Sequence, residues 1–161
     1  MLYITLGQPF NVPPRDRLEL HDRAGIGGII RLDPFDGSNR EVYARGIRNS
    51  VGLDFNPKDN TLWFTDNQTD GMGDDIPPGV INRATRPGQH FGYPWLGGHK
   101  VRITEHGYDK DKLPEGVVGP QVETVAHGAD LGMTFYTGRM FPKKYHGGIF
   151  NAQHGSWNQS S

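Results

Sequence analysis

The residues best suited to chemistry lie within residues 44–75. An adjacent pair, Arg48 and Asn49, falls between two strand-like segments. A guanidinium donates a planar fork of hydrogen bonds that suits carboxylates, and an asparagine amide both donates and accepts. The pair could therefore bind a planar polyanion or the hydroxyl groups of a sugar. A solvated arginine beside an asparagine in a turn is the simpler alternative.

An acidic, glycine-containing loop, DNQTDGMGDD, follows in residues 66–75. Oxygen-bearing side chains at alternate positions before Gly71 match the first half of a calcium-binding loop. Pro77 stands where an EF-hand carries its glutamate, and no helical pattern flanks the loop, so the EF-hand is excluded. Two interpretations remain open: a calcium site built partly from main-chain carbonyls, with Asp74 and Asp75 close by, or an Asx-rich turn.

The seven histidines form no zinc motif, and the chain has no cysteine. His127 and His154 each adjoin a glycine at the end of a strand-like segment, where an imidazole could act as a base, a ligand or a hydrogen-bonded surface group. Ser156 lies in HGSWN rather than in a G-x-S-x-G motif, which argues against a hydrolase nucleophile. The aromatic residues of segment 89–95 could stack on a planar ligand or fill the gap between two sheets.

Short strands must position these residues. Gly (23) and Pro (12) exceed a fifth of the 161 residues, which favours an all-β chain with many turns. β-branched and aromatic runs predict strands at 2–6, 27–33, 41–44, 51–55, 61–66, 80–83, 122–125, 131–136 and 148–152. One helical turn is expected within residues 16–21.

A repeat organises the strands. The segments GLDF (52–55) and LWFTDN (62–67) resemble GMTF (132–135) and IFNAQ (149–153), and LYITLG (2–7) resembles the second half of the same unit. Repeats of this kind are typical of propeller blades. We therefore predict a partial β-propeller over residues 1–161, truncated at both ends, with about two to three blades of four-stranded antiparallel sheet. A self-contained antiparallel sandwich is the alternative.

The net charge of −1 does not favour a nucleic-acid partner, and no apolar run is long enough to span a membrane. The strand-like residues 2–6 follow Met1 directly, so no signal peptide is expected. The absence of cysteine is compatible with the cytoplasm or the periplasm. Exposed blade faces would allow a homo-oligomer.

Several motifs together resemble the glucose/sorbosone dehydrogenase family, and within it the L-sorbosone dehydrogenase-like branch. They are GIRNSVGL (46–53), LWFTDN (62–67), GDDIPP (73–78), HFGYP (90–94), LGMTFYTG (131–138) and HGSWN (154–158). The family comprises soluble sugar dehydrogenases that depend on pyrroloquinoline quinone (PQQ). The resemblance implies a six-bladed β-propeller with PQQ over its central mouth.

The resemblance also implies site residues and a reaction. Arg48 and Asn49 match the cofactor-binding pair of the family, and the main-chain carbonyls of Asn67 and Gln68 match those that hold the PQQ-bound calcium ion. A sugar hydroxyl or aldehyde hydrate would be oxidised by hydride transfer to PQQ. The implied partners are a small-molecule sugar and an electron acceptor such as a quinone or a cytochrome, and the implied location is periplasmic or secreted.

The chain departs from the family pattern at three places. The catalytic histidine would precede Leu2, so no catalytic residue is assigned and little or no activity is expected of these 161 residues alone. Gln8 stands where many members carry aspartate, and Gly79 with Val80 replaces an acidic pair, which argues against a second calcium site. The alternatives are a non-enzymatic β-propeller binding module and a lactonase-like calcium propeller, which would need several converging acidic ligands.

Overall fold

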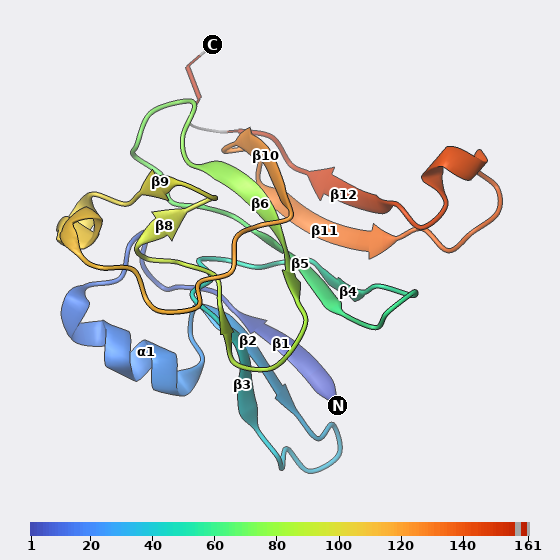
Figure 1. The fold of residues 1–161 in the computed structure, drawn as a ribbon, viewed down its shortest axis with the longest axis horizontal. Helices are drawn as coiled ribbons and strands as arrows, with labels where there is room; N and C mark the ends of the chain where they lie inside the picture. Colours follow the sequence, from blue (N-terminus) through green and yellow to red (C-terminus); the bar gives the residue numbers. More distant parts are fainter. Residues whose placement is uncertain (157–158, 161) are drawn as a thin grey trace.

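The strands form two four-stranded sheets followed by a long hairpin (Figure 1). The structure is a computed structural model that describes residues 1–156 and 159–160. The first sheet has the order β1 (Leu2–Leu6), β2 (Gly28–Leu32), β3 (Glu41–Arg45) and β7 (Gln89–His90). The second has the order β10 (Val122–Ala126), β6 (Pro78–Ala84), β5 (Leu62–Asp66) and β4 (Leu53–Phe55). The hairpin pairs β11 (Asp130–Phe135) with β12 (Ile149–Gln153), and β8 (Leu96–Gly97) pairs with β9 (Val101–Arg102).

The arrangement is that of a partial β-propeller, as predicted. The second sheet is antiparallel throughout, and β1 corresponds to β5 because each pairs antiparallel with the next strand of its sheet. The hairpin β11–β12 repeats the pair β4–β5, and β11 packs against both of those strands. In the first sheet the outermost strand, β7, runs parallel to β3, because it belongs to the long excursion that follows β6.

The helical content is small but exceeds the single turn expected within residues 16–21. A 3-10 turn, η1 (Arg15–Arg17), leads into the α-helix α1 (Leu18–Ala24). The helix ends because Gly25 adopts a left-handed conformation, with a φ of 79°. Seven residues are too few for a 3.6-residue period to stand out in the sequence. Two further 3-10 turns are η2 (Glu105–Lys110) and η3 (Lys143–Tyr145).

The main core lies between the two four-stranded sheets. It joins Ile29 and Tyr43 of the first sheet to Leu62 and Phe64 of the second. Phe91 lies in this core, and its ring meets the ring of Phe64 edge to face at 5.0 Å. This part of the aromatic segment 89–95 therefore fills the gap between blades, as one of the two interpretations from the sequence expected.

Polar contacts join the second sheet to the hairpin. The Thr65 hydroxyl donates to the carbonyl of Leu131 at 3.0 Å. The Asp54 Oδ2 atom accepts hydrogen bonds from the Thr134 hydroxyl and from the main-chain N–H of Phe135. Because these bonds join adjacent units, they fix the position of the hairpin along β4 and β5.

Close main-chain packing at Gly52 makes this contact sensitive to a single methyl group. A Cβ atom at residue 52 would lie 2.3 Å from the carbonyl oxygen of Leu131 and 2.6 Å from the amide nitrogen of Met133. We expect Gly52→Ala to lower the free energy of unfolding by about 1–3 kcal/mol, as overpacking typically does, measured by urea denaturation. Gly132→Ala is the matched control, because a Cβ atom there would meet nothing within 4 Å. Equal stability of the two variants would contradict this account.

His90 packs tightly beneath another glycine. A Cβ atom at Gly46 would lie 2.3 Å from the His90 ring, and the Nδ1 atom of that ring accepts the N–H of Gly92 at 3.0 Å. Burial lowers the pKa of His90 from 6.5 to about 4, with opposing influences from Asp22, which raises it, and Arg45, which lowers it. The neutral imidazole is therefore the form that the fold accommodates.

The lowered pKa of His90 predicts acid sensitivity. The unfolded chain protonates this imidazole near pH 6.5 and the folded chain near pH 4. Stability is therefore fully present above pH 6.5 and falls as the pH drops towards 4, by up to about 3 kcal/mol from this group. Urea denaturation at pH 7.5 and 4.5 measures the loss. His90→Gln cannot titrate at this position, so an unchanged loss in that variant would assign it to other groups.

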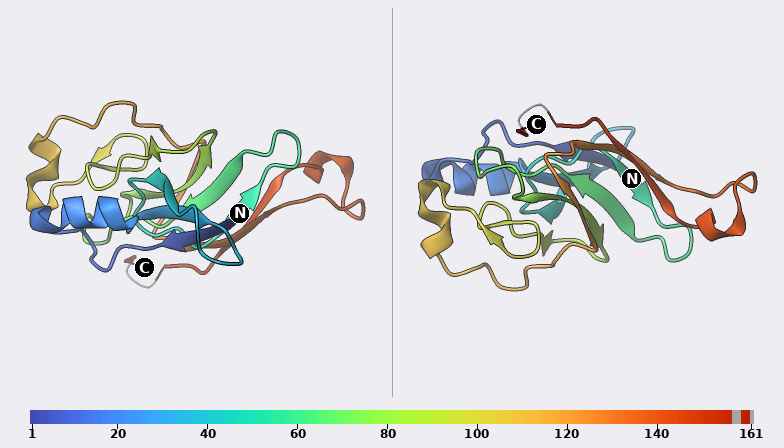
Figure 2. Two further views of the ribbon diagram at one scale, coloured as in Figure 1. Left: turned by 90° about the horizontal axis from the view of Figure 1, so that it is seen from below. Right: turned by 90° about the horizontal axis from the view of Figure 1, so that it is seen from above.

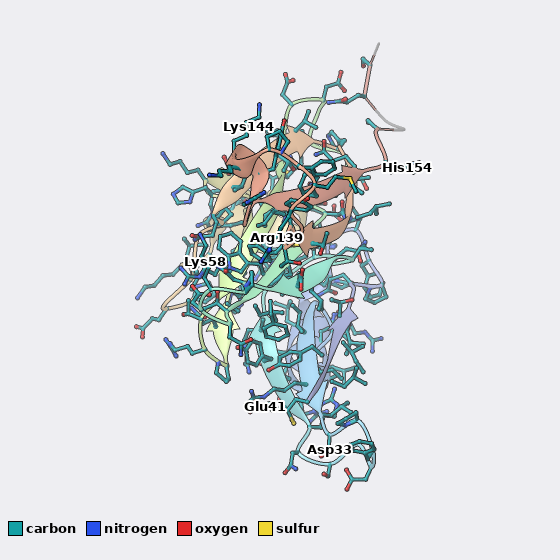
Figure 3. The ribbon with its side chains drawn as sticks, turned by 90° about the vertical axis from the view of Figure 1, so that its right-hand side faces the viewer. Asp33, Glu41, Lys58, Arg139, Lys144 and His154 are labelled. Atoms are coloured by element: carbon teal, nitrogen blue, oxygen red, sulfur yellow. The ribbon has the colours of Figure 1, made fainter. Side chains whose placement is uncertain are left out.

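The hairpin extends away from the two sheets (Figure 2). Its outer part carries a cluster of aromatic rings, and Met140 there is 90% exposed. Lys144 and His154 lie towards one end of the molecule, and Asp33 and Glu41 lie at the other (Figure 3). Among the described residues, no helix has the length and apolar character needed to cross a bilayer.

Candidate functional site

Two loops, one that follows β3 and one that follows β5, meet at Asp66, the last residue of β5. One Asp66 oxygen, Oδ1, accepts the main-chain N–H groups of Arg48 and Asn49 at 3.0 and 2.8 Å. The other, Oδ2, accepts a hydrogen bond from Gln68 Nε2 at 2.8 Å. Burial raises the pKa of Asp66 to about 7, and the Asn49 N–H and the Arg48 charge oppose this rise. One buried carboxyl group thus holds together the Arg-Asn pair and the beginning of the acidic loop.

The four residues predicted for cofactor and metal binding line one cavity of about 200 Å³. Its walls are Arg48, Asn49, Asn67, Gln68, Asp70, Pro77, Gly79, His127, Ala129 and Leu131. They come from the loop after β3, the loop after β5 with the start of β6, and the connection into β11 with the start of that strand. The cavity is smaller than the roughly 300 Å³ at which drug-sized ligand sites begin. The cavity as it stands is therefore too small to enclose a drug-sized ligand.

The Arg48 guanidinium is positioned by Asn11 and Asp70. Its Nη2 atom donates to Asn11 Oδ1 at 3.0 Å and lies 3.5 Å from Asp70 Oδ2, and its Nε atom donates to the Asn11 carbonyl at 3.3 Å. The Asn11 amide also bonds the main chain of Asp70 in both directions, at 2.9 and 3.0 Å. The Tyr93 hydroxyl donates to the Asn11 carbonyl. Asn11 therefore fixes the direction of the arginine and the shape of the acidic loop.

Asn67 ties the site to the next blade. Its main-chain N–H donates to the Asn49 carbonyl at 3.0 Å, and its side-chain Nδ2 donates to the Asp130 carbonyl at 2.8 Å. The fully buried Asp130 carboxylate accepts hydrogen bonds from Thr124, Asn151 and Gln153. The wall is thus anchored on two sides by buried side chains.

The two histidines left open by the sequence fall in different places. His127 lines the cavity, where its Nε2 donates to the Gly73 carbonyl at 2.7 Å and its Nδ1 lies 3.5 Å from Asp70 Oδ1. His154 and Ser156 are both exposed, and neither is part of the cavity wall. The HGSWN motif also includes Trp157 and Asn158, which lie outside the described residues.

Three groups at the cavity are suited to a ligand. Gln68 Oε1 is buried and has no hydrogen-bond partner within residues 1–156 and 159–160. Over the same residues, no hydrogen bond is found for Arg48 Nη1 or for the side-chain amide of Asn49. Gln68 Oε1 is an oxygen that could coordinate a calcium ion, and the Arg48 Nη1 and Asn49 amide N–H groups could donate hydrogen bonds to carboxylates. The three groups together suit a calcium-bound tricarboxylate. The residues present therefore fit the group that the family resemblance implies.

A protein-only metal site is not found in the described part of the chain, which holds no group of three or more His, Cys, Asp or Glu side chains placed to bind an ion. Gly79, where many family members are expected to carry an acidic residue, lies against the carboxylate of Asp130. A Cβ atom at Gly79 would lie 2.1 Å from Asp130 Oδ2. Val80 is buried.

Sequence reasoning missed Asn11 altogether. It lies 37 residues before Arg48, in a proline-rich loop whose pattern predicts only irregular structure. Only the contact between Asn11 and the Arg48 side chain in the folded chain identifies Asn11 as part of the site.

The chain belongs to the glucose / sorbosone dehydrogenase family, whose model matches residues 1–154. It is 45% identical over 163 residues to an uncharacterised protein of Borreliella burgdorferi and 27% identical over 161 residues to the aldose sugar dehydrogenase YliI of Escherichia coli. These alignments cover 99% and 88% of this chain but only 40% and 39% of those relatives. The chain thus spans about two fifths of the length of the curated relatives that it matches.

Solved structures agree on the fold. A calcium structure of the Trichoderma reesei carbohydrate-active enzyme of family AA12 superimposes with a TM-score of 0.73 at 20% identity, over 98% of this chain and 46% of that one. The PQQ-bound aldose sugar dehydrogenase of Streptomyces coelicolor superimposes with a TM-score of 0.51 at 25% identity, over 83% of this chain and 35% of that one.

Proposed function

We propose that these residues form part of a PQQ-dependent sugar dehydrogenase and supply one wall of its cofactor site. The observation that carries the proposal is the single cavity shared by Arg48, Asn49, Asn67 and Gln68. Support comes from membership of the glucose / sorbosone dehydrogenase family and from the PQQ-bound aldose sugar dehydrogenase among the structural neighbours. A sugar substrate, a quinone or cytochrome acceptor and a periplasmic or secreted location belong to the same proposal.

In this proposal each residue of the wall has a separate task. Arg48, held by Asn11, directs Nη1 towards a cofactor carboxylate, and Asn49 offers a neutral donor and acceptor beside it. The main-chain carbonyls of Asn67 and Gln68 would hold calcium, with the unpartnered Gln68 Oε1 as a further oxygen nearby. When bound, PQQ would accept the hydride of the sugar while calcium polarises its quinone carbonyl.

Calcium and PQQ should bind cooperatively in this arrangement. Because no cluster of acidic ligands is found among the described residues, neutral carbonyls alone would hold the ion weakly. A bound polyanionic cofactor would supply the negative charge that these carbonyls lack. By linkage, calcium should then raise the affinity for PQQ by the same factor by which PQQ raises the affinity for calcium.

The test is a titration of the chain with PQQ, followed by absorbance, in calcium and in a chelator. The expected result is saturable binding that requires calcium, with little reduction of a dye by glucose from these 161 residues alone. PQQ binding that is absent, or indifferent to calcium, would contradict the proposal and favour a non-enzymatic β-propeller binding module. Substantial turnover would contradict only the expectation of low activity.

A further inference from the structure

A second, larger cavity of about 330 Å³ lies between α1 and the segment that contains β7 and Trp95. In Figure 1 this is the region where the blue helix approaches the yellow strands and turns. It shares no lining residue with the candidate cofactor cavity. Its volume is within the range of small-molecule sites.

Three residues that line this cavity each carry a buried polar atom that lacks a partner among the described residues. The atoms are Gln8 Oε1, His21 Nδ1 and Arg45 Nε. The whole of His21 is only 5% exposed. Buried polar atoms without a partner are rare in native proteins, and three around one cavity call for a bound group. Gly27 makes room for the Gln8 side chain, because a Cβ atom there would lie 2.2 Å from Gln8 Nε2.

The charges of the wall argue against an anionic ligand, because the exposed Glu19 adds a carboxylate to a wall whose other charges are paired. Arg45 Nη1 contacts both carboxylate oxygens of Asp22, at 3.1 and 2.9 Å, so the cation and the anion compensate each other. Arg45 Nε remains as a donor, Gln8 Oε1 as an acceptor, and His21 Nδ1 can serve as either. Hydroxyl groups, which donate and accept at once, satisfy such a mixed set.

The remaining wall suits a saturated ring. Leu18, Ile26, Pro94 and Trp95 line the cavity, and the Trp95 indole is held by a hydrogen bond from Nε1 to Asp111 Oδ2 at 3.0 Å. A hydroxylated ring has apolar C–H faces that pack on such surfaces and a polar rim that reaches the three unpartnered atoms. We propose that this cavity binds a neutral, monosaccharide-sized polyol, at a site separate from the cofactor wall.

The experiment is a calorimetric titration of the 161-residue chain, without PQQ or calcium, with methyl α-D-glucopyranoside. Saturable binding with a Kd on the order of 1–10 mM is expected. Gln8→Leu removes the acceptor at similar size and should weaken binding about tenfold, as one lost hydrogen bond does. Arg86→Gln, at an exposed position outside both cavity walls, is the control and should bind like the parent chain.

A second variant, Leu18→Trp, fills the half-buried edge of the cavity and should abolish binding. It provides the test if Gln8→Leu fails to fold. No saturable binding by the parent chain would assign the cavity to water and overturn the proposal. Loss of binding in Arg48→Gln but not in Gln8→Leu would overturn it as well, by placing the sugar in the cofactor cavity. Tighter binding of glucuronate than of the glucoside would overturn the assignment of a neutral ligand. Because PQQ and calcium are omitted, none of these outcomes depends on the proposed dehydrogenase function.

Discussion

Replacing Asp66 by alanine is expected to lower the free energy of unfolding by about 3–5 kcal/mol. The change removes the acceptor of two main-chain N–H groups, those of Arg48 and Asn49, and of the Gln68 side chain. Asp66 is 2% exposed, so water cannot fully replace the lost acceptor. Each buried donor left without a partner costs about 1–3 kcal/mol. Urea denaturation followed by circular dichroism measures the change.

The conservative variant Asp66→Asn separates the hydrogen bonds from the charge. An amide oxygen can still accept both main-chain N–H groups, and the Gln68 amide can turn to accept from the new Nδ2 atom. An uncharged side chain also avoids the burial cost that raises the pKa of Asp66. We therefore expect a loss of only about 1 kcal/mol for Asp66→Asn. Equal losses for the two variants would show that the carboxylate charge, rather than its acceptor role, holds the loops together.

Arg48→Gln is expected to lower the affinity for PQQ about 100-fold under the proposed function. The variant removes the guanidinium fork that Asn11 and Asp70 position, and a charge-assisted bond to a carboxylate contributes about 1.5–3 kcal/mol. Arg48→Lys keeps the charge but not the fork and should lose about tenfold. The measurement is the absorbance titration with PQQ in the presence of calcium.

Arg86→Gln provides the control for Arg48→Gln. It makes the same change in net charge at an exposed position outside the cavity wall. Its PQQ affinity should stay within about twofold of the parent chain, because an exposed charge contributes little. If both variants lose affinity equally, net charge controls binding and the proposed contact is wrong. Thermal unfolding of each variant shows whether the loss of Arg48 contacts also destabilises the loops.

Much of the fold could be predicted because strand formation is a local property. Alternation and β-branched content placed the strands near β1, β2, β3, β5 and β11, and the turn residues separated them. The repeat of β4–β5 by β11–β12 was visible because both units need a small residue, then an apolar strand, at the same positions. The parallel pairing of β7 with β3 was not visible, because a two-residue strand carries no pattern of its own.

The candidate site was predicted in part. Arg48, Asn49, Asn67 and Gln68 could be selected from the sequence, and the structure places all four on one cavity. Their roles towards PQQ and calcium remain predictions. His127 could be singled out by its neighbouring glycine, but its place beside Asp70 required the connection before β11 to fold back over the acidic loop.

The sequence by itself determined the composition of the wall: an arginine fork, an amide and an oxygen-rich loop close together along the chain. The tertiary structure alone decided which residues aim and hold them, because Asn11, Asp66 and Asp130 act through contacts across 17 to 63 residues. Such contacts depend on how neighbouring blades pack, and no local pattern encodes that distance. The cavity beside α1 has the same origin, since its unpartnered atoms come from a loop, a helix and a strand that only the fold brings together.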